Sequence, residues 1–373
     1  MKLYLLAVIG FIFFSCTQKK TKQDIHQYFS KKTSENIQLK LNKISTLTLE
    51  NHEEESIGAP LYNVEFDTSG NMYFFDTIES KFIIYDNKGR FLKTLGRVGR
   101  GPIEFELVYG YTLDNKNNLY VYDDALRRIK VIDDSLKLSS SYAIDNKSYY
   151  ITSHDLEVVN DNLYLGILGI EAASVTDNSE KLINSPLIMF YDIENQLEEK
   201  RYNYIGTYDP YLMEIESYYY RPIFSIDRKK ETILVSHQNS YRFQEFDLKT
   251  GNLIKYFGFK SENYGEGEKK SSRNKNRKEN FVNTLSESNN EMVFTTDEFI
   301  GNFYLSGTEQ WFDSKDLSDL RYFLSIYSRE NYTYLTTFQV DYRLIKVHDN
   351  KFYFIENENP EEFKIGVYEL IEV

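Results

Sequence analysis

Three acidic residues stand at corresponding positions of a repeat and have the chemistry of a cation site. Asp76 and Asp123 each end an apolar run at the same place in two similar segments, and Glu356 takes that place in a later segment. Hard cations such as Ca²⁺ and Mg²⁺ bind several carboxylate oxygens, so these acids predict a divalent-cation site. The favoured alternative is structural, because an aspartate at the end of a strand accepts hydrogen bonds from the backbone N–H groups of the turn.

Aromatic and cationic side chains form a second candidate set, which is suited to an organic ligand. The set consists of Tyr208, Tyr211, Tyr218, Tyr219, Tyr220 and Arg221 in one long predicted loop, and of His237 at the end of a later apolar run. Tyrosine rings provide a stacking platform for a carbohydrate or a peptide, and the arginine provides a polar anchor. For each tyrosine the alternative is packing of the loop onto the body of the protein.

Two arginines, Arg97 and Arg100, lie in the glycine-rich segment Gly96–Gly101 and have the charge to hold an anion. Guanidinium and backbone N–H groups together form anion sites. No helix is predicted after these glycines, so the segment is not a nucleotide-binding fingerprint. The alternative role is conformational, because the glycines allow the chain to cross tightly from one group of strands to the next.

Motifs of catalytic chemistry are sparse. The five histidines show no metal-ligand spacing, no Gly-x-Ser-x-Gly sequence occurs, and the only cysteine is Cys16. We therefore favour a binding module that requires no cofactor. A metal-dependent hydrolase or lyase, similar to a lactonase or a glycosidase, stays as the alternative, because carboxylates from distant strands can converge at one site.

The chain begins with the pattern of an export signal over residues 1–15. A twelve-residue apolar run, Leu3–Phe14, precedes Ser15 and Cys16, and it is shorter than the roughly 20 residues of a membrane-spanning helix. The junction resembles a bacterial lipobox, so we expect lipid on the Cys16 sulfur to hold the protein to a membrane. Residues 16–33 are then a flexible stalk. The alternatives are an ordinary signal peptide and a short membrane anchor.

Charge and composition limit the classes of partner. A net charge of −13 and a pI near 5.1 argue against a surface for nucleic acid or anionic membranes. The content of hydrophobic residues is 41% and that of aromatic residues is 16%, which supports a large core. We expect a monomer that binds a carbohydrate, a peptide or another protein.

An internal repeat organises the chain after the stalk. Asp67, Asn71 and Tyr73 recur as Asp114, Asn118 and Tyr120, in each case 47 residues later. Each unit is predicted to contain four strands joined by tight turns, and a period of this length is typical of the blades of a β-propeller. We therefore predict an all-β fold over residues 34–373, a single propeller of six blades with four antiparallel strands each. Seven blades is the alternative count.

The last predicted blade is one strand short, because the chain ends at Val373. Alternating apolar residues near the N-terminus can supply the missing outer strand, either at Ile37, Leu39 and Leu41 or at Ile44–Leu49. Such pairing closes the ring and protects its last strand edges.

The residues of the second unit also carry a family resemblance. The segments Leu119–Asp123 and Arg128–Asp133 resemble an NHL-type propeller repeat, and Gly96–Phe105 resembles the link between blades in six-bladed propeller lipoproteins of Bacteroidetes. This resemblance implies a lipoprotein of the cell envelope that binds ligands or proteins. Surface-exposed members carry acids after the lipidated cysteine, whereas Thr17–Lys22 is basic here, which favours a position facing the periplasm.

Three long insertions are predicted on one face of the propeller, where second strands end and the next blade begins. They span residues 169–186, 204–222 and 259–281. Long loops on a compact scaffold often carry function. This loop-rich face is therefore the predicted binding surface.

Overall fold

The computed structural model describes residues 37–51, 63–144, 148–169, 183–193, 202–212, 221–265, 288–306, 314, 319–359 and 361–373. The predicted signal peptide, the stalk and Cys16 lie outside the described residues, as do Tyr218, Tyr219 and Tyr220. Among the described residues, no helix has the length and apolar character to cross a membrane.

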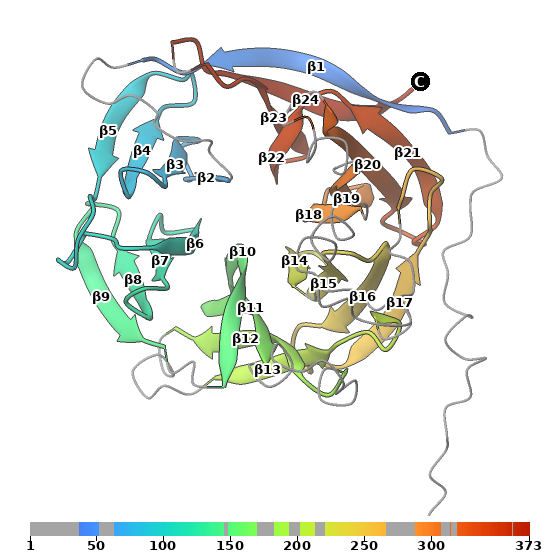
Figure 1. Cartoon of the computed structure of the whole chain (residues 1–373), viewed down its shortest axis with the longest axis horizontal. Helices are drawn as coiled ribbons and strands as arrows, with labels where there is room; N and C mark the ends of the chain where they lie inside the picture. Colours follow the sequence, from blue (N-terminus) through green and yellow to red (C-terminus); the bar gives the residue numbers. More distant parts are fainter. Residues whose placement is uncertain are drawn as a thin grey trace, which may run out of the picture.

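Six blades of four antiparallel strands surround a central axis, and blades two and three are joined into one eight-stranded sheet (Figure 1). The first blade contains β2 (Val64–Phe66), β3 (Met72–Asp76), β4 (Lys81–Tyr85) and β5 (Phe91–Leu95), and the second contains β6 (Val108–Leu113), β7 (Leu119–Asp123), β8 (Arg128–Ile132) and β9 (Leu138–Ala143). The third contains β10 (Tyr149–Val159), β11 (Asn162–Gly169), β12 (Pro186–Asp192) and β13 (Asn203–Thr207), and the fourth contains β14 (Pro222–Asp227), β15 (Thr232–His237), β16 (Arg242–Asp247) and β17 (Leu253–Gly258).

The fifth blade contains β18 (Asn289–Thr295), β19 (Phe299–Ser306), β20 (Arg321–Ser328) and β21 (Tyr334–Val340), and the sixth contains β22 (Arg343–His348), β23 (Lys351–Asn357), β24 (Lys364–Glu372) and β1 (Leu39–Thr48). The first strand of each sequence unit lies nearest the axis (Figure 1). One parallel bridge, between Tyr111 and Asp155, joins the inner strands of blades two and three. The prediction of an all-β propeller with six blades is confirmed.

The turn after each inner strand explains why the repeat is visible in the sequence. The Asp67 carboxylate accepts hydrogen bonds from the backbone N–H of Asn71 at 2.8 Å and from the Asn71 side chain at 2.8 Å. Asp114 and Asn118 make the same two contacts, each at 2.8 Å. Gly70 adopts a φ of 79°, a left-handed conformation that suits glycine in this turn.

The hydrophobic core is divided into clusters that lie between neighbouring blades. In β15, Ile233 and Val235 belong to the cluster shared with blade three, whereas Leu234 belongs to the cluster shared with blade five. A strand that is covered on both faces has apolar residues at successive positions instead of alternating apolar and polar residues. This double burial accounts for the unbroken apolar runs of the second strands.

The ring closes through β1, the outermost strand of the last blade, which pairs antiparallel with β24 (Figure 1). A bulge between Lys43 and Ser45 shifts the register. Before the bulge Leu39 and Leu41 pack towards blade five, and after it Leu47 packs towards blade one. Both predicted apolar segments therefore contribute to the closing strand, one on each of its faces.

The glycine-rich link between blades one and two is held against the body of the protein. Gly96 has a φ of 92°, and a Cβ atom there would lie 2.4 Å from the Phe105 ring. The buried Lys130 ammonium donates a hydrogen bond to the carbonyl oxygen of Gly101 at 2.9 Å. The glycines therefore allow the tight crossing between the two blades.

Replacing Leu49 with alanine tests how much the closing segment stabilises the ring. Leu49 is 2% exposed in the cluster between blades six and one, so Leu49→Ala should lower the free energy of unfolding by about 3 kcal/mol. Ile44→Ala, a change at a 45% exposed position of β1, should alter it by less than about 0.5 kcal/mol. Urea unfolding followed by circular dichroism measures both; equal effects would mean that closure is not the source of the stability.

Candidate functional site

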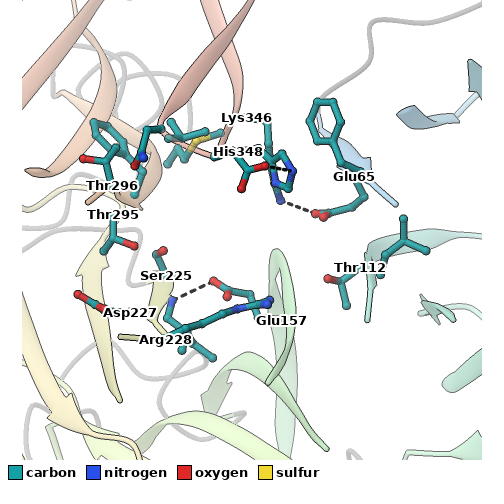
Figure 2. A pocket seen from close by; sticks show the side chains of 18 of the residues that line it. Glu65, Thr112, Glu157, Ser225, Asp227, Arg228, Thr295, Thr296, Lys346 and His348 are labelled. Carbon is teal, nitrogen blue, oxygen red and sulfur yellow. Dashed lines mark hydrogen bonds and ion pairs between the residues drawn. The ribbon is translucent and has the colours of Figure 1, made fainter. Parts of the chain in front are cut away.

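A central cavity of about 970 Å³ opens where the inner strands of the six blades converge (Figure 2). Its walls are the last residues of these strands and the turns that follow them. All six blades contribute polar side chains, namely Glu65, Thr112, Glu157, Ser225, Arg228, Thr295, Thr296, Lys346 and His348. We call the end of the propeller that carries these turns the first-turn face. It is opposite to the predicted loop-rich face.

An ion pair joins the last blade to the first within the cavity. The Lys346 ammonium lies 2.5 Å from a carboxylate oxygen of Glu65, and the Asn63 side chain donates a longer hydrogen bond of 3.4 Å to the same oxygen. Both partners are largely buried, so the interaction is less screened than a surface pair would be. The Glu65 carboxylate is thereby held in one position at the cavity wall.

Glu157 is the second carboxylate of the cavity and has a perturbed acidity. It accepts a hydrogen bond from the backbone N–H of Ile226 at 3.0 Å, which links blades three and four. Burial raises the pKa of Glu157 to about 7, because the opposing effects of Lys346 and Arg228 are smaller than the desolvation. Near neutral pH this side chain is therefore divided between its carboxylic acid and carboxylate forms.

Arg228 follows β14 and extends into the cavity beside Glu157 (Figure 2). The side chain is exposed, and its guanidinium donates one long hydrogen bond, 3.4 Å, to the carbonyl oxygen of Val158. Among the described residues it forms no ion pair. This distinguishes it from Lys346, which is paired with Glu65.

His348 lies on the opposite wall and packs against an aromatic ring. Its imidazole stacks on Phe66 with ring centroids 4.7 Å apart, and its Nε2 atom lies 3.5 Å from the Asp349 carboxylate. Burial and the nearby Lys346 lower the pKa of His348, and they outweigh the opposite effect of Asp349. The imidazole is therefore mainly neutral at physiological pH.

The remaining acids near the cavity rim take part in the turns. Asp227 accepts hydrogen bonds from the N–H groups of Lys229 and Lys230, each at 3.0 Å, and forms a buried ion pair with Arg329 of blade five. Lys229 in turn pairs with Asp297. Each of these groups already has a partner within the protein, so they support the walls rather than offer free charge.

The two predicted arginines lie away from this cavity. Arg97 forms an ion pair of 2.6 Å with Glu104, and Arg100 one of 2.6 Å with Glu106. Both arginine side chains are more than three-quarters exposed, at 78% and 77%. The structure shows them as surface ion pairs that flank the link between blades.

The predicted aromatic set forms core packing in its described part. Tyr208 is 1% exposed, stacks on His237 with centroids 5.1 Å apart, and donates a hydrogen bond of 3.0 Å to a backbone carbonyl. Tyr211 is 9% exposed and contacts Tyr241 edge to face. Arg221 is half-buried at the start of β14. Tyr208 and His237 do meet, but as buried residues between blades three and four, so the described members of the set form no exposed stacking platform.

The three predicted metal ligands do not converge. Asp76 accepts hydrogen bonds from the N–H groups of Ile78 and Glu79, and Asp123 accepts them from Glu106, Leu107 and Leu126. Glu356 pairs with Lys43 at 2.7 Å, between the last blade and its closing strand. Within the described residues, no three side chains of His, Cys, Asp or Glu lie together so that they could hold a metal ion.

The sequence did contain a signal for the cavity. Glu65 and Thr112 are 47 residues apart, the same interval as the repeat, and each is a polar residue within an otherwise apolar inner strand. Across the sheet they pair with Tyr73 and Tyr120, which recur at the same interval. The inner strands, and not the ends of the second strands, therefore carry the sequence signal for the cavity.

Comparisons with known proteins support the fold. Residues 17–170 match the model of the DUF5128 family, described as a 6-bladed beta-propeller. The structure is similar to that of a DUF4221-family member from Bacteroides vulgatus, with a TM-score of 0.73 at 11% identity, covering 91% of this chain and 100% of that chain. It is also similar to a protein from Bacteroides fragilis described as exported, with a TM-score of 0.59 at 12% identity, covering 92% and 99%.

No curated protein sequence matches the chain. At 11% and 12% identity, the likeness to the two solved structures concerns the fold alone. The class of the protein is thus a six-bladed β-propeller. More particularly, its architecture is similar to that of propellers from Bacteroides, which confirms the resemblance to Bacteroidetes propellers expected from the repeat and the link.

Replacing Glu157 with glutamine tests whether the pKa of the Glu157 carboxyl group is raised. The raised pKa means that the carboxyl group favours folding while it is protonated, and that this contribution is lost as the pH rises from about 4.5 through about 7. Glu157→Gln keeps an acceptor for the Ile226 N–H group but cannot ionise. The variant should therefore be more stable than the wild type at pH 8 by about 3 kcal/mol, and equally stable at pH 4.

Urea unfolding at the two pH values measures this difference, with Glu330→Gln, a change of an exposed acid in the turn after β20, as the control. A stability difference between Glu157→Gln and the wild type that does not change with pH would contradict the assignment.

Proposed function

We propose that this protein is a binding module that takes a small hydroxyl-rich ligand of the carbohydrate class in the central cavity. The observation that carries the proposal is the convergence of polar side chains from all six blades on one cavity of about 970 Å³. A volume of this size is typical of small-molecule sites. The proposal places the ligand at the first-turn face and not at the loop-rich face, because the cavity opens there.

The side chains of the cavity suit a ligand that makes many hydrogen bonds. Thr112, Ser225 and Thr295 offer hydroxyl groups that can donate and accept hydrogen bonds. The Glu65 carboxylate is fixed by Lys346 and keeps acceptor capacity. The stacked pair of Phe66 and His348 adds a flat apolar surface against which a sugar ring can pack.

We further propose that the propeller is held at the cell envelope by lipid on Cys16 and faces the periplasm. The export signal, the single cysteine at its end and the basic residues that follow support this arrangement. The similar propeller from Bacteroides fragilis is described as exported. Anchoring would keep the binding module close to the membrane.

Blocking the cavity tests the ligand proposal. The expected result is that at least one member of a panel of mono- and disaccharides raises the melting temperature of the wild type by about 2 °C or more. Ser225→Tyr, which fills the cavity with an aromatic ring, should abolish that shift. Thr77→Tyr, at an exposed turn away from the cavity, should retain it. Binding that persists in Ser225→Tyr would place the ligand elsewhere.

Replacing Cys16 with serine tests the anchor. A serine hydroxyl cannot take the thioether-linked lipid, so Cys16→Ser should move from the detergent phase to the aqueous phase of a Triton X-114 partition and should lose incorporation of an alkyne-labelled fatty acid. Thr17→Ser, one residue further on, should behave as the wild type. Unchanged partition of Cys16→Ser would exclude anchoring by lipid on this residue.

A further inference from the structure

We propose that the ligand of the central cavity carries a carboxylate, as in a sugar acid, and that Arg228 binds this group. The inference rests on the proposed function, since it names the chemical class of the ligand for the same cavity. It follows from how the charged side chains of the cavity are paired and where Arg228 lies among them.

The other cations that line the cavity already have acidic partners. Lys346 is paired with Glu65, Lys229 with Asp297, and Arg329 with Asp227. Arg228 forms no ion pair with any acid in the described part of the chain, although its side chain is exposed to the cavity. A positive charge that the protein leaves uncompensated at a binding site favours an anionic ligand.

The geometry of Arg228 suits a carboxylate better than a single hydroxyl group. A guanidinium presents parallel N–H donors that match the two oxygens of a carboxylate. Within the part of the chain that the structure describes, Arg228 donates one hydrogen bond, 3.4 Å to the Val158 carbonyl, which leaves most of these donors for a ligand. Lys346 and His348 lie across the cavity from it (Figure 2), so the rest of the ligand would extend towards them.

Glu157 makes the binding of an anion dependent on pH. The charged groups around it are Arg228 on blade four, Lys346 on blade six and Glu65 on blade one. When Glu157 is protonated, the charge of Arg228 is uncompensated and the carboxylic acid can donate a hydrogen bond. When Glu157 ionises as the pH rises through about 7, its charge opposes that of the ligand. The affinity for a carboxylate should therefore fall between pH 6 and pH 8.

His348 is the other titratable group that faces this part of the cavity. Burial and the nearby Lys346 lower the pKa of His348, so more acidic conditions are needed to charge it. Protonation of His348 would also favour an anion, but at more acidic pH. Removal of the Glu157 charge by mutation separates the two contributions.

Isothermal titration calorimetry with matched sugar pairs tests the inference. The probes are glucuronate with glucose, galacturonate with galactose and mannuronate with mannose, and acetate serves as a carboxylate without a sugar ring. We expect at least one acid to bind the wild type about tenfold or more tightly than its neutral partner at pH 6, and about three- to tenfold more weakly at pH 8 than at pH 6. Acetate should bind far more weakly than that acid.

Variants assign the effect to the named residues. Arg228→Gln should lower the affinity for the acid until it equals the affinity of the same variant for the neutral sugar. Lys88→Gln, which removes an exposed cation in the turn between β4 and β5, outside the cavity lining, should behave as the wild type. Glu157→Gln should keep the preference for the acid at both pH values and remove the fall between them.

The outcomes separate this inference from the proposed function. Neutral sugars that bind as tightly as the acids would overturn the carboxylate inference and leave the cavity as a carbohydrate site. An unchanged preference in Arg228→Gln would also overturn it. Absence of binding by every sugar and acid in the panel would overturn both.

Discussion

Closure of the ring is the constraint on which the rest of the structure depends. Each blade is apolar on both faces, as the division of Ile233, Val235 and Leu234 between two clusters shows, so a blade is stable only between two neighbours. The last blade obtains its outer strand from the other end of the chain, where β1 pairs with β24. The bulge in β1 lets one strand present leucines to both neighbouring blades. Closure thereby joins the ends of the described chain and leaves no blade with a bare apolar face.

The cavity is a consequence of the same geometry. The inner strands converge on the axis, and the side chains near their ends line the central cavity. Polar residues such as Glu65 and Glu157 are tolerated there because contacts from the adjacent blade, Lys346 and the Ile226 N–H group, satisfy them. The burial that keeps these contacts intact also raises the pKa of Glu157. The convergence of the inner strands therefore produces both the cavity and the raised pKa of Glu157.

Much of the fold was predictable because its determinants are local. The Asp–Asn turns repeat with the same hydrogen bonds at Asp67 and Asp114, and they mark the blades in the sequence. The candidate sites were less predictable because they depend on which side chains different blades bring together. Asp76 and Asp123 were singled out by their place in the repeat, yet their oxygens accept bonds from nearby N–H groups. Tyr208 was singled out by its loop, yet it packs in the core.

The sequence by itself determined the repeat, the turn chemistry and a closing strand from the N-terminal segment, since each depends on short segments or on the spacing between them. The structure decided for six blades over seven and showed that both apolar parts of that segment contribute to the closing strand. The tertiary structure alone decided the site. Glu157 and Arg228 come from different blades, and Lys346 meets Glu65 only because the ring is closed. The assembled ring buries Glu157. Within the described residues it also gives every cation of the cavity lining except Arg228 an acidic partner. Both properties depend on neighbours that are distant in the chain.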